Sequence, residues 1–459
     1  MVGNRWWRIW RTRWVAGGLA LLAVATIGSF VLFGSTDAAV TASPSLPRRL
    51  GAPSVYTPDA RHTPIGAASV VFTGGAWGLD GSEFDIALTG LRNDAYRTLP
   101  ESFNSTAGIT AILSPNGTQL AVENGIVNLA TGTTTRLPPD GGDYRHPEAW
   151  SLDGRYLATV TYTQPDFEAP ETFGGAWTSP VTHAVLSVVD TSDGHETTIA
   201  DVDMTANFDG WLAAFSPDGT KLAYQSGNRI VVVTPAGAPI AAFAVPAGTR
   251  IAGKGAWTRD GSALAVVAER PCGCGRTYDA RWTLTTIDAS TGATMGTAYI
   301  VDGVVAIRVL GWTHTGRPVV ATYDAGTAGD LDPSYQIVDF RPHSDAGIDQ
   351  TGLYMSGVEN LDNVFGTRVL VLAAAGPPQV LLASSSPGAE SVDIADDVIA
   401  GSLSRAGHPP LATFDRVAEG AACAVAAVLF AGLVAAIIVL VQRLHRSRRH
   451  RRTGLASGS

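Results

Sequence analysis

Acidic and aromatic side chains gather in segment 163–182, which has the sequence TQPDFEAPETFGGAWTSPVT, and segment 324–334, DAGTAGDLDPS, is acidic. Carboxylates attract cationic groups, and aromatic rings stack on cations and offer rigid apolar surface. We predict an acidic, partly aromatic surface for a cationic or carbohydrate-like partner. Its candidate residues are Asp166, Phe167, Glu168, Glu171, Phe173, Trp177, Asp324, Asp330 and Asp332. The alternative is that both segments are loop insertions without a ligand.

Three aspartates of the second segment are the side chains best suited to a metal ion. Asp324, Asp330 and Asp332 would supply oxygen ligands, which hard cations such as calcium prefer. Their spacing does not match an EF-hand loop, and we predict no metal site and no cofactor.

Two of the three cysteines, Cys272 and Cys274, are separated by a single glycine. An exported cysteine pair favours oxidation, so a local disulfide is the first candidate. A ring this small is tight and would be reducible. Free thiols, intermolecular pairing and metal binding remain alternatives, although no histidine lies in the same segment to complete a metal site.

Signatures of common catalytic sites are missing from the sequence. There is no Gly-x-Ser-x-Gly motif of a serine hydrolase and no Gly-x-x-x-x-Gly-Lys-Ser/Thr phosphate loop. The histidines of the central region, such as His146, His195 and His314, are scattered. We predict no catalytic residue.

The elements that would position these segments come from a repeated motif. A large apolar residue is followed by a small residue, any residue, Asp or Asn, and Gly, and an apolar residue comes three positions later. The glycines of seven copies are Gly81, Gly117, Gly154, Gly219, Gly261, Gly316 and Gly366; the sixth copy lacks the acid and the seventh is degenerate. Asp-Gly and Asn-Gly pairs tolerate the positive φ of tight hairpins.

Many copies continue into a second strand pair, as at 186–194 and 284–292, so a unit holds about four short strands. Four-stranded units of about 40–50 residues are typical of propeller blades, which bury their sheet faces against one another. We predict an all-β fold with a seven-bladed propeller, or alternatively six blades. The aromatic residues before the turns should pack between blades: Trp77, Trp150, Phe215, Trp257 and Trp312.

The run Ser216-Pro-Asp-Gly-Thr-Lys-Leu-Ala223 resembles the WD40-like repeat of TolB-type β-propellers, and the resemblance extends over about residues 65–400. It implies a propeller but no particular activity, because this fold hosts many functions. The closing strand could come from 68–72 or from 379–400. Segments 163–182, 269–281 and 324–334 each follow the second strand of a unit, so we expect them on one face.

Both ends of the chain have the features of membrane segments. Residues 15–33 and 420–441 are uncharged runs long enough to cross a bilayer. Arginines flank the outer side of each run, which places both termini in the cytoplasm by the positive-inside rule. Tryptophans alternate with arginines in 5–14, as expected for an arm along the inner membrane surface. A cleaved N-terminal signal sequence is the alternative for the first run.

We therefore divide the chain into seven parts. They are a cytoplasmic arm (1–14), a transmembrane helix or signal (15–34), a tether (35–64), an extracytoplasmic propeller (65–400), a tether (401–417), a transmembrane helix (418–441) and a basic cytoplasmic tail (442–459). The predicted location is the plasma membrane, and lipid is a predicted partner.

Charge supports this division and excludes one class of partner. The chain has 41 acidic and 32 basic residues, a net charge of −9. Residues 35–417 hold 40 of the acids, so the central region lacks the basic surface that nucleic acids require. Arginine greatly outnumbers lysine, and alanine and glycine are abundant, as in GC-rich bacterial, actinobacterial-like genomes.

These observations predict a non-catalytic, membrane-anchored, extracytoplasmic β-propeller that binds or scaffolds envelope proteins or other ligands. One alternative is an enzyme with a site at the propeller channel, such as a lactonase or lyase. The other is a signal transducer that couples the propeller to the cytoplasmic tail.

Overall fold

The computed structural model of the chain describes residues 43–53, 57–75, 83–99, 107–108, 110–123, 125–137, 144–162, 183–203, 212–273, 280–304, 306–325, 364–384 and 389–409, with a few helical residues between 429 and 441. All of them belong to the compact unit Ala42–Ser459, and the unit Met1–Thr41 lies outside the described residues.

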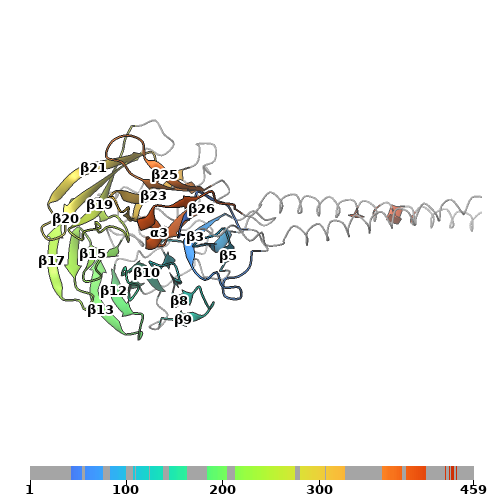
Figure 1. Cartoon of the computed structure of the whole chain (residues 1–459), viewed down its shortest axis with the longest axis horizontal. Coiled ribbons are helices and arrows are strands. Elements are labelled where there is room, and N and C mark those ends of the chain that lie inside the picture. Colours follow the sequence, from blue (N-terminus) through green and yellow to red (C-terminus); the bar gives the residue numbers. More distant parts are fainter. Residues whose placement is uncertain are drawn as a thin grey trace, which may run out of the picture. The chain divides into compact units, whose positions relative to one another are not determined.

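Six antiparallel sheets stand in a ring, and the first strands of neighbouring sheets meet at its centre (Figure 1). Blade 1 is β26 (Ala389–Ile394), β3 (Ala68–Gly75), β4 (Glu83–Gly90) and β5 (Tyr96–Thr98); blade 2 is β6 (Ile112–Leu113), β7 (Gln119–Val122), β8 (Gly125–Asn128) and β9 (Thr134–Arg136); blade 3 is β10 (Tyr144–Trp150), β11 (Tyr156–Tyr162), β12 (His183–Asp190) and β13 (Glu196–Asp203). Blade 4 is β14 (Ala213–Phe215), β15 (Leu222–Ser226), β16 (Arg229–Val233) and β17 (Pro239–Ala244); blade 5 is β18 (Thr249–Ile251), β19 (Ala263–Arg270), β20 (Arg281–Asp288) and β21 (Thr294–Asp302); blade 6 is β22 (Ala306–Trp312), β23 (Pro318–Ala325), β24 (Val364–Val371) and β25 (Gln379–Ser384). The chain is a six-bladed β-propeller.

The first prediction, seven blades, is wrong and the six-bladed alternative is confirmed, because two of the seven motif copies do not mark a blade of their own. Gly117, Gly154, Gly219, Gly261 and Gly316 lie between the first and second strands of blades 2 to 6, as the motif predicts. The other two copies are not equivalent to these. Gly366 lies inside β24, a third strand, and Gly81, outside the described residues, comes between the second and third strands of blade 1.

Blade 1 is built from both ends of the propeller sequence, because β26 pairs with β3 in register Ile394↔Val70. Both segments proposed for closure, 68–72 and 379–400, therefore contribute to it. Two further parallel pairings join the chain ends. Strand β2 (Arg49–Leu50) adds to β25, and β1 (Leu46–Pro47) pairs with β27 (Ser404–Arg405), so the predicted tethers contain short strands.

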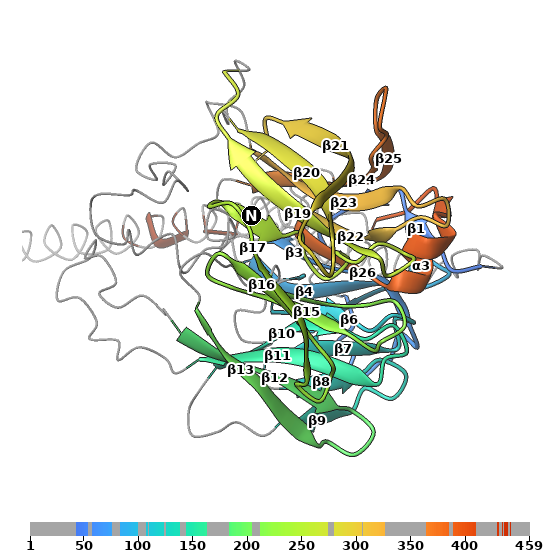
Figure 2. The ribbon, with the colours of Figure 1, turned by 90° about the vertical axis from the view of Figure 1, so that its left-hand side faces the viewer.

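The two ends of the sheets differ in their connections. We call the end that carries the turns between first and second strands and between third and fourth strands the turn end. The end that carries the connections between second and third strands is the loop end. The short helix α3 (Asp396–Gly401) follows the first strand β26 and thus lies at the turn end, seen edge-on in Figure 2.

The motif turns are held by a repeated hydrogen-bond pattern. In blade 3 the Ser151 hydroxyl donates to Asp153 at 2.6 Å, and the same hydroxyl accepts from the Tyr156 amide at 2.8 Å. The bond from Ser151 holds the pKa of Asp153 below its usual range. Gly154 has a φ of 72°, which side-chain-bearing residues rarely adopt. The motif residues are therefore needed by the turn itself.

The predicted packing of motif aromatics between blades is confirmed for the described members. Each indole donates a hydrogen bond to a carbonyl of the preceding blade: Trp150 to Ile112 (3.3 Å), Trp257 to Ala214 (2.9 Å) and Trp312 to Gly255 (2.9 Å). The Phe215 ring stacks on Tyr156 of the preceding blade with centroids 6.5 Å apart. Trp77 lies outside the described residues.

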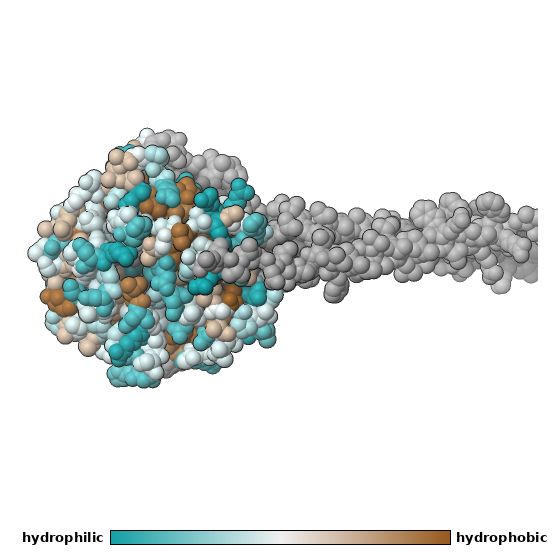
Figure 3. All heavy atoms as spheres, in the orientation of Figure 1, coloured by the Kyte–Doolittle hydropathy of each residue, from teal (hydrophilic) through white to brown (hydrophobic). Residues whose placement is uncertain are grey.

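The propeller face seen in Figure 3 is mostly hydrophilic, with scattered apolar side chains. The part of the chain that the structure describes contains no helix of the length and hydropathy that a membrane crossing requires. The first predicted membrane segment, 15–34, lies outside that part, as does most of 418–441.

Candidate functional site

The three long segments expected on one face leave from the same end of the propeller. Segment 163–182 joins β11 to β12, 271–280 joins β19 to β20, and 326–363 joins β23 to β24. All three connect a second to a third strand, so they begin and end at the loop end. Most candidate residues fall outside the described residues, where their placement stays a prediction: Asp166, Phe167, Glu168, Glu171, Phe173, Trp177, Asp330 and Asp332.

Asp324 is the one candidate of this surface that the structure describes. It lies near the end of β23 and accepts two hydrogen bonds from Arg368 of β24, from Nε and Nη2, each at 2.5 Å. A bidentate ion pair neutralises this carboxylate at the loop end. Within the described residues, no group of three or more His, Cys, Asp or Glu side chains could hold a metal ion.

Cys272 comes two residues after the end of β19 and is disulfide-bonded. Cys274 lies outside the described residues, so its pairing with Cys272 remains a prediction. The bonded state of Cys272 agrees with an oxidised cysteine at this position.

A buried charged cluster joins residues from the inner strands of several blades, and we name it for its place near the centre of the ring. Lys254, between β18 and β19, donates to Asp393 of β26 at 3.0 Å and to the carbonyl of Ile394 at 2.8 Å. Asp393 also accepts from the Leu113 amide of blade 2 at 2.9 Å. Arg308 of β22 lies 3.5 Å from the same carboxylate and donates to the Val392 carbonyl at 2.6 Å. We call Lys254, Arg308 and Asp393 the channel cluster.

The channel cluster is almost completely buried, with side-chain exposures of 5% for Lys254, 1% for Arg308 and 0% for Asp393. Its contacts join blades 1, 2, 5 and 6 across the channel. Small neighbours make room for it, since a Cβ on Gly108 or Gly253 would lie within 2.5 Å of Arg308 atoms. Removing one member of such a buried group is costly, because it leaves the opposite charge buried without its partner.

Helix α3 covers the channel cluster. Ile399 packs on Gly311 of β22, and Asp396 places a carboxylate 3.8 Å from Lys254. Burial raises the pKa of Asp396 to about 6; Lys254 opposes this shift, while Asp393 and Asp397 add to it. The side chain keeps 24% exposure, so solvent reaches Asp396.

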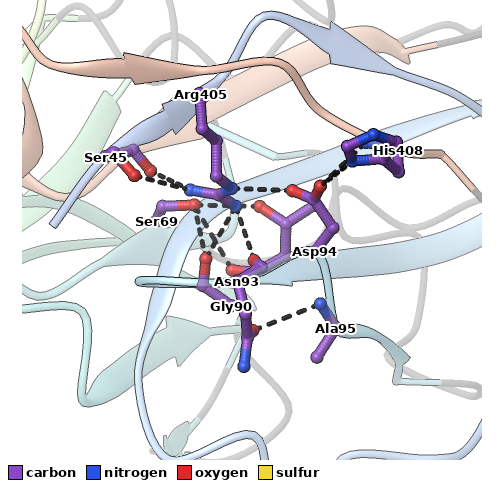
Figure 4. Close-up of polar contacts among 9 residues, drawn as sticks. Ser45, Ser69, Gly90, Asn93, Asp94, Ala95, Arg405 and His408 are labelled. Carbon is purple, nitrogen blue, oxygen red and sulfur yellow. Dashed lines mark hydrogen bonds and ion pairs between the residues drawn. The ribbon is translucent and has the colours of Figure 1, made fainter. Parts of the chain in front are cut away.

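A second charged group, which we call the latch, joins the chain ends at the turn end (Figure 4). Arg405 of β27 donates to Asp94 at 2.7 Å and to the Asn93 carbonyl at 2.7 Å in the β4–β5 turn, and to the carbonyl of Gly90, the last residue of β4, at 2.9 Å. It also donates to the carbonyl of Ser45, just before β1. One guanidinium thus binds both chain ends to blade 1.

His408 completes the latch from the C-terminal side. Its amide donates to Asp94 at 2.9 Å, and its ring Nδ1 lies 2.8 Å from the same oxygen. Burial alone would raise the pKa of Asp94, but the hydrogen bonds from Arg405 and His408 outweigh it and hold the pKa below its usual value. Asp94 and Arg405 are 6% and 7% exposed, so this pair is shielded from water.

Sequence reasoning missed both charged groups. Lys254 carried a signal, because it is one of only two lysines in an arginine-rich chain. Arg405 and Asp94 carried none, since they are separated by 311 residues and belong to no motif.

Comparisons with known proteins add the following. No family model matches the chain, and no curated protein matches it. Similar solved structures include an oligogalacturonate lyase in complex with manganese (16% identity, covering 72% of this chain and 88% of that one, TM-score 0.39). A putative TolB from Agrobacterium tumefaciens is 14% identical (50% and 87% covered, TM-score 0.29). The β-propeller domain of Cps50 (Swd1) from Myceliophteria thermophila is 18% identical (51% and 72% covered, TM-score 0.31). These likenesses are too distant to bear on activity.

Proposed function

We propose that this protein is a non-catalytic, membrane-anchored, extracytoplasmic propeller that binds or scaffolds envelope proteins or other ligands through its loop end. In this arrangement the two basic chain ends lie in the cytoplasm and the uncharged runs 15–34 and 418–441 cross the plasma membrane. The acidic loop-end residues would meet a cationic or carbohydrate-like partner.

The observation that carries this proposal is the separation of chain ends from long connections. The latch fixes residues 45 and 405–408 to the β4–β5 turn, which belongs to the turn end. The connections after β11, β19 and β23 leave from the opposite end. Tethers that start at the turn end would hold the loop end away from the membrane, where long loops on a rigid scaffold can meet partners.

The channel cluster argues against the enzyme alternative at the turn end. Catalytic acids and bases must reach a substrate proton, but Asp393 and Lys254 are buried and hydrogen-bonded to each other. The transducer alternative requires a cytoplasmic partner for the tail, and capture of partners with and without residues 442–459 would distinguish it.

The proposal is tested by site-specific photo-crosslinking in native membranes, with probes at opposite ends of one blade. A photoreactive residue at Trp177 lies in the connection between β11 and β12, and the matched control replaces Asp193 in the exposed β12–β13 turn. We expect capture of a specific envelope component from position 177 only. Equal capture from both positions, or none from 177, would contradict a loop-end binding surface.

Anchoring needs its own measurement. A reporter fused after Ser459 should be active only in the cytoplasm, and the full chain should resist alkaline extraction from membranes. Reporter activity outside the cell would overturn the proposed topology without bearing on the crosslinking result.

A further inference from the structure

A pull on the two ends of the chain would separate the β26–β3 pair that closes the ring by breaking its hydrogen bonds in sequence. Strands β26 and β3 are antiparallel, so the end of β26 at Ile394 and the start of β3 near Val70 lie side by side. The chain continues from these points toward its two ends. A pull on both ends would therefore load the β26–β3 hydrogen bonds one pair after another, which is the weak direction for a sheet.

The pairing of β1 with β27 has the opposite geometry. These strands are parallel, with Leu46 beside Ser404 and Pro47 beside Arg405. The Leu46 amide donates to the Leu403 carbonyl at 2.8 Å, and the Arg48 amide donates to the Arg405 carbonyl at 2.9 Å. A pull on the N-terminal end of β1 and the C-terminal end of β27 acts at opposite ends of the pair. All of its hydrogen bonds then share the load in shear.

Each member of this pair is also fixed to a blade. On the N-terminal side, the Ala383 amide of β25 donates to the Arg48 carbonyl at 3.0 Å, which ties the segment to blade 6. On the C-terminal side, Arg405 and His408 bind Asp94 of blade 1. Gly407 permits the close approach, because it has a φ of 75° and a Cβ there would lie 2.8 Å from the Arg49 carbonyl oxygen.

We propose that the latch, together with the β1–β27 pair, is a load-bearing clamp that prevents tension on the two chain ends from opening the ring at β26–β3. Its role in the cell rests on the proposed anchoring of both ends. The clamp converts a peeling load into a shearing one and passes it to blades 1 and 6. Arg405 is its central residue, because it contacts the β4–β5 turn and the Ser45 carbonyl at once.

The test is to pull the full chain by its two ends in a single-molecule force measurement. At a fixed load, Arg405→Ala should open the ring roughly tenfold faster or more than the wild type, because it removes several hydrogen bonds made by one buried charge. Arg405→Lys should fall between them. The matched control is Arg281→Ala, which removes an exposed ion pair to Asp302 in blade 5 and should open at the wild-type rate.

If Arg405→Ala folds poorly, a disulfide crosslink across the β1–β27 pair provides a second test. Leu46→Cys with Ser404→Cys joins the two partners of the parallel pair, and its oxidised form should open more slowly than its reduced form under the same load. Equal opening rates for wild type and Arg405→Ala, or for the oxidised and reduced crosslink, would overturn the clamp. The force measurement does not depend on membrane topology, so its outcome is independent of the result from the reporter fused after Ser459.

Discussion

The channel cluster and the latch both fix the C-terminal segment 389–408, but with charges of opposite sign and at different depths. At the channel, the segment contributes the acid Asp393 to bases of blades 5 and 6. At the rim, it contributes the base Arg405 to the acid Asp94 of blade 1. The first group holds the ring together from inside, and the second joins the ring to its tethers. The four predictions below test this difference.

The largest effect is expected at the channel. Asp393→Ala leaves Lys254 and Arg308 buried beside no carboxylate from β26, and breaking a buried pair costs about 3–5 kcal/mol. Urea unfolding followed by tryptophan fluorescence measures the loss. A loss within about 1 kcal/mol would show that the channel cluster does not hold the ring.

The next effect is expected at the latch. Asp94→Asn weakens the bonds from Arg405 and His408, so the free energy of local opening should fall by about 2 kcal/mol. Because the pKa of Asp94 is lowered on folding, its contribution is present above the unfolded pKa near 3.8 and is lost as the pH falls below that value. Hydrogen exchange of residues 403–408 should show this acid sensitivity in the wild type. If hydrogen exchange in Asp94→Asn keeps the same acid sensitivity, a group other than Asp94 causes that sensitivity.

Asp396 should respond to pH in the opposite sense. Its folded pKa of about 6 exceeds the usual 3.8, so the folded state binds the proton more tightly than the unfolded state does. Stability should therefore decrease as the pH rises from about 4 to 6. Asp396→Asn should remove this dependence and stabilise the protein above pH 6 by about 1–2 kcal/mol in urea unfolding. A destabilised variant at pH 7 would mean that ionised Asp396 supports the cluster through Lys254.

The smallest effect is expected at an exposed pair outside both groups. Arg281 and Asp302 in blade 5 are 45% and 29% exposed, and water screens such pairs. Arg281→Ala should change the free energy of unfolding by less than about 1 kcal/mol. A larger loss of unfolding free energy would mean that solvent exposure does not decide how much an ion pair of this protein contributes to stability.

Local patterns were enough to predict much of the fold. The Asp-Gly and Asn-Gly turns were readable because the backbone conformation they require is set by the turn residues, as at Gly154. The common end of the three long connections followed from their position after second strands. The aromatic residues before the turns were assigned to blade contacts because they recur at one position of the motif in most of its copies.

The blade count and both charged groups could not be predicted in this way. Blade 1 takes its first strand from the C-terminal end and the other three from the N-terminal end, so no continuous stretch of sequence represents it. The seven motif copies also included Gly366, which lies inside the strand β24 and marks no turn. Lys254 and Asp393 lie 139 residues apart, and neither belongs to a repeat position that would relate them.

The sequence alone determined the type of unit, the turns between its strands and the charge contrast between the ends and the middle of the chain. These features depend on neighbouring residues and on backbone preferences that act within a few positions. The tertiary structure decided how many units close the ring, which charges meet in its channel and where the two chain ends are joined. Those outcomes depend on contacts between residues far apart in the chain, which form only when the ring closes.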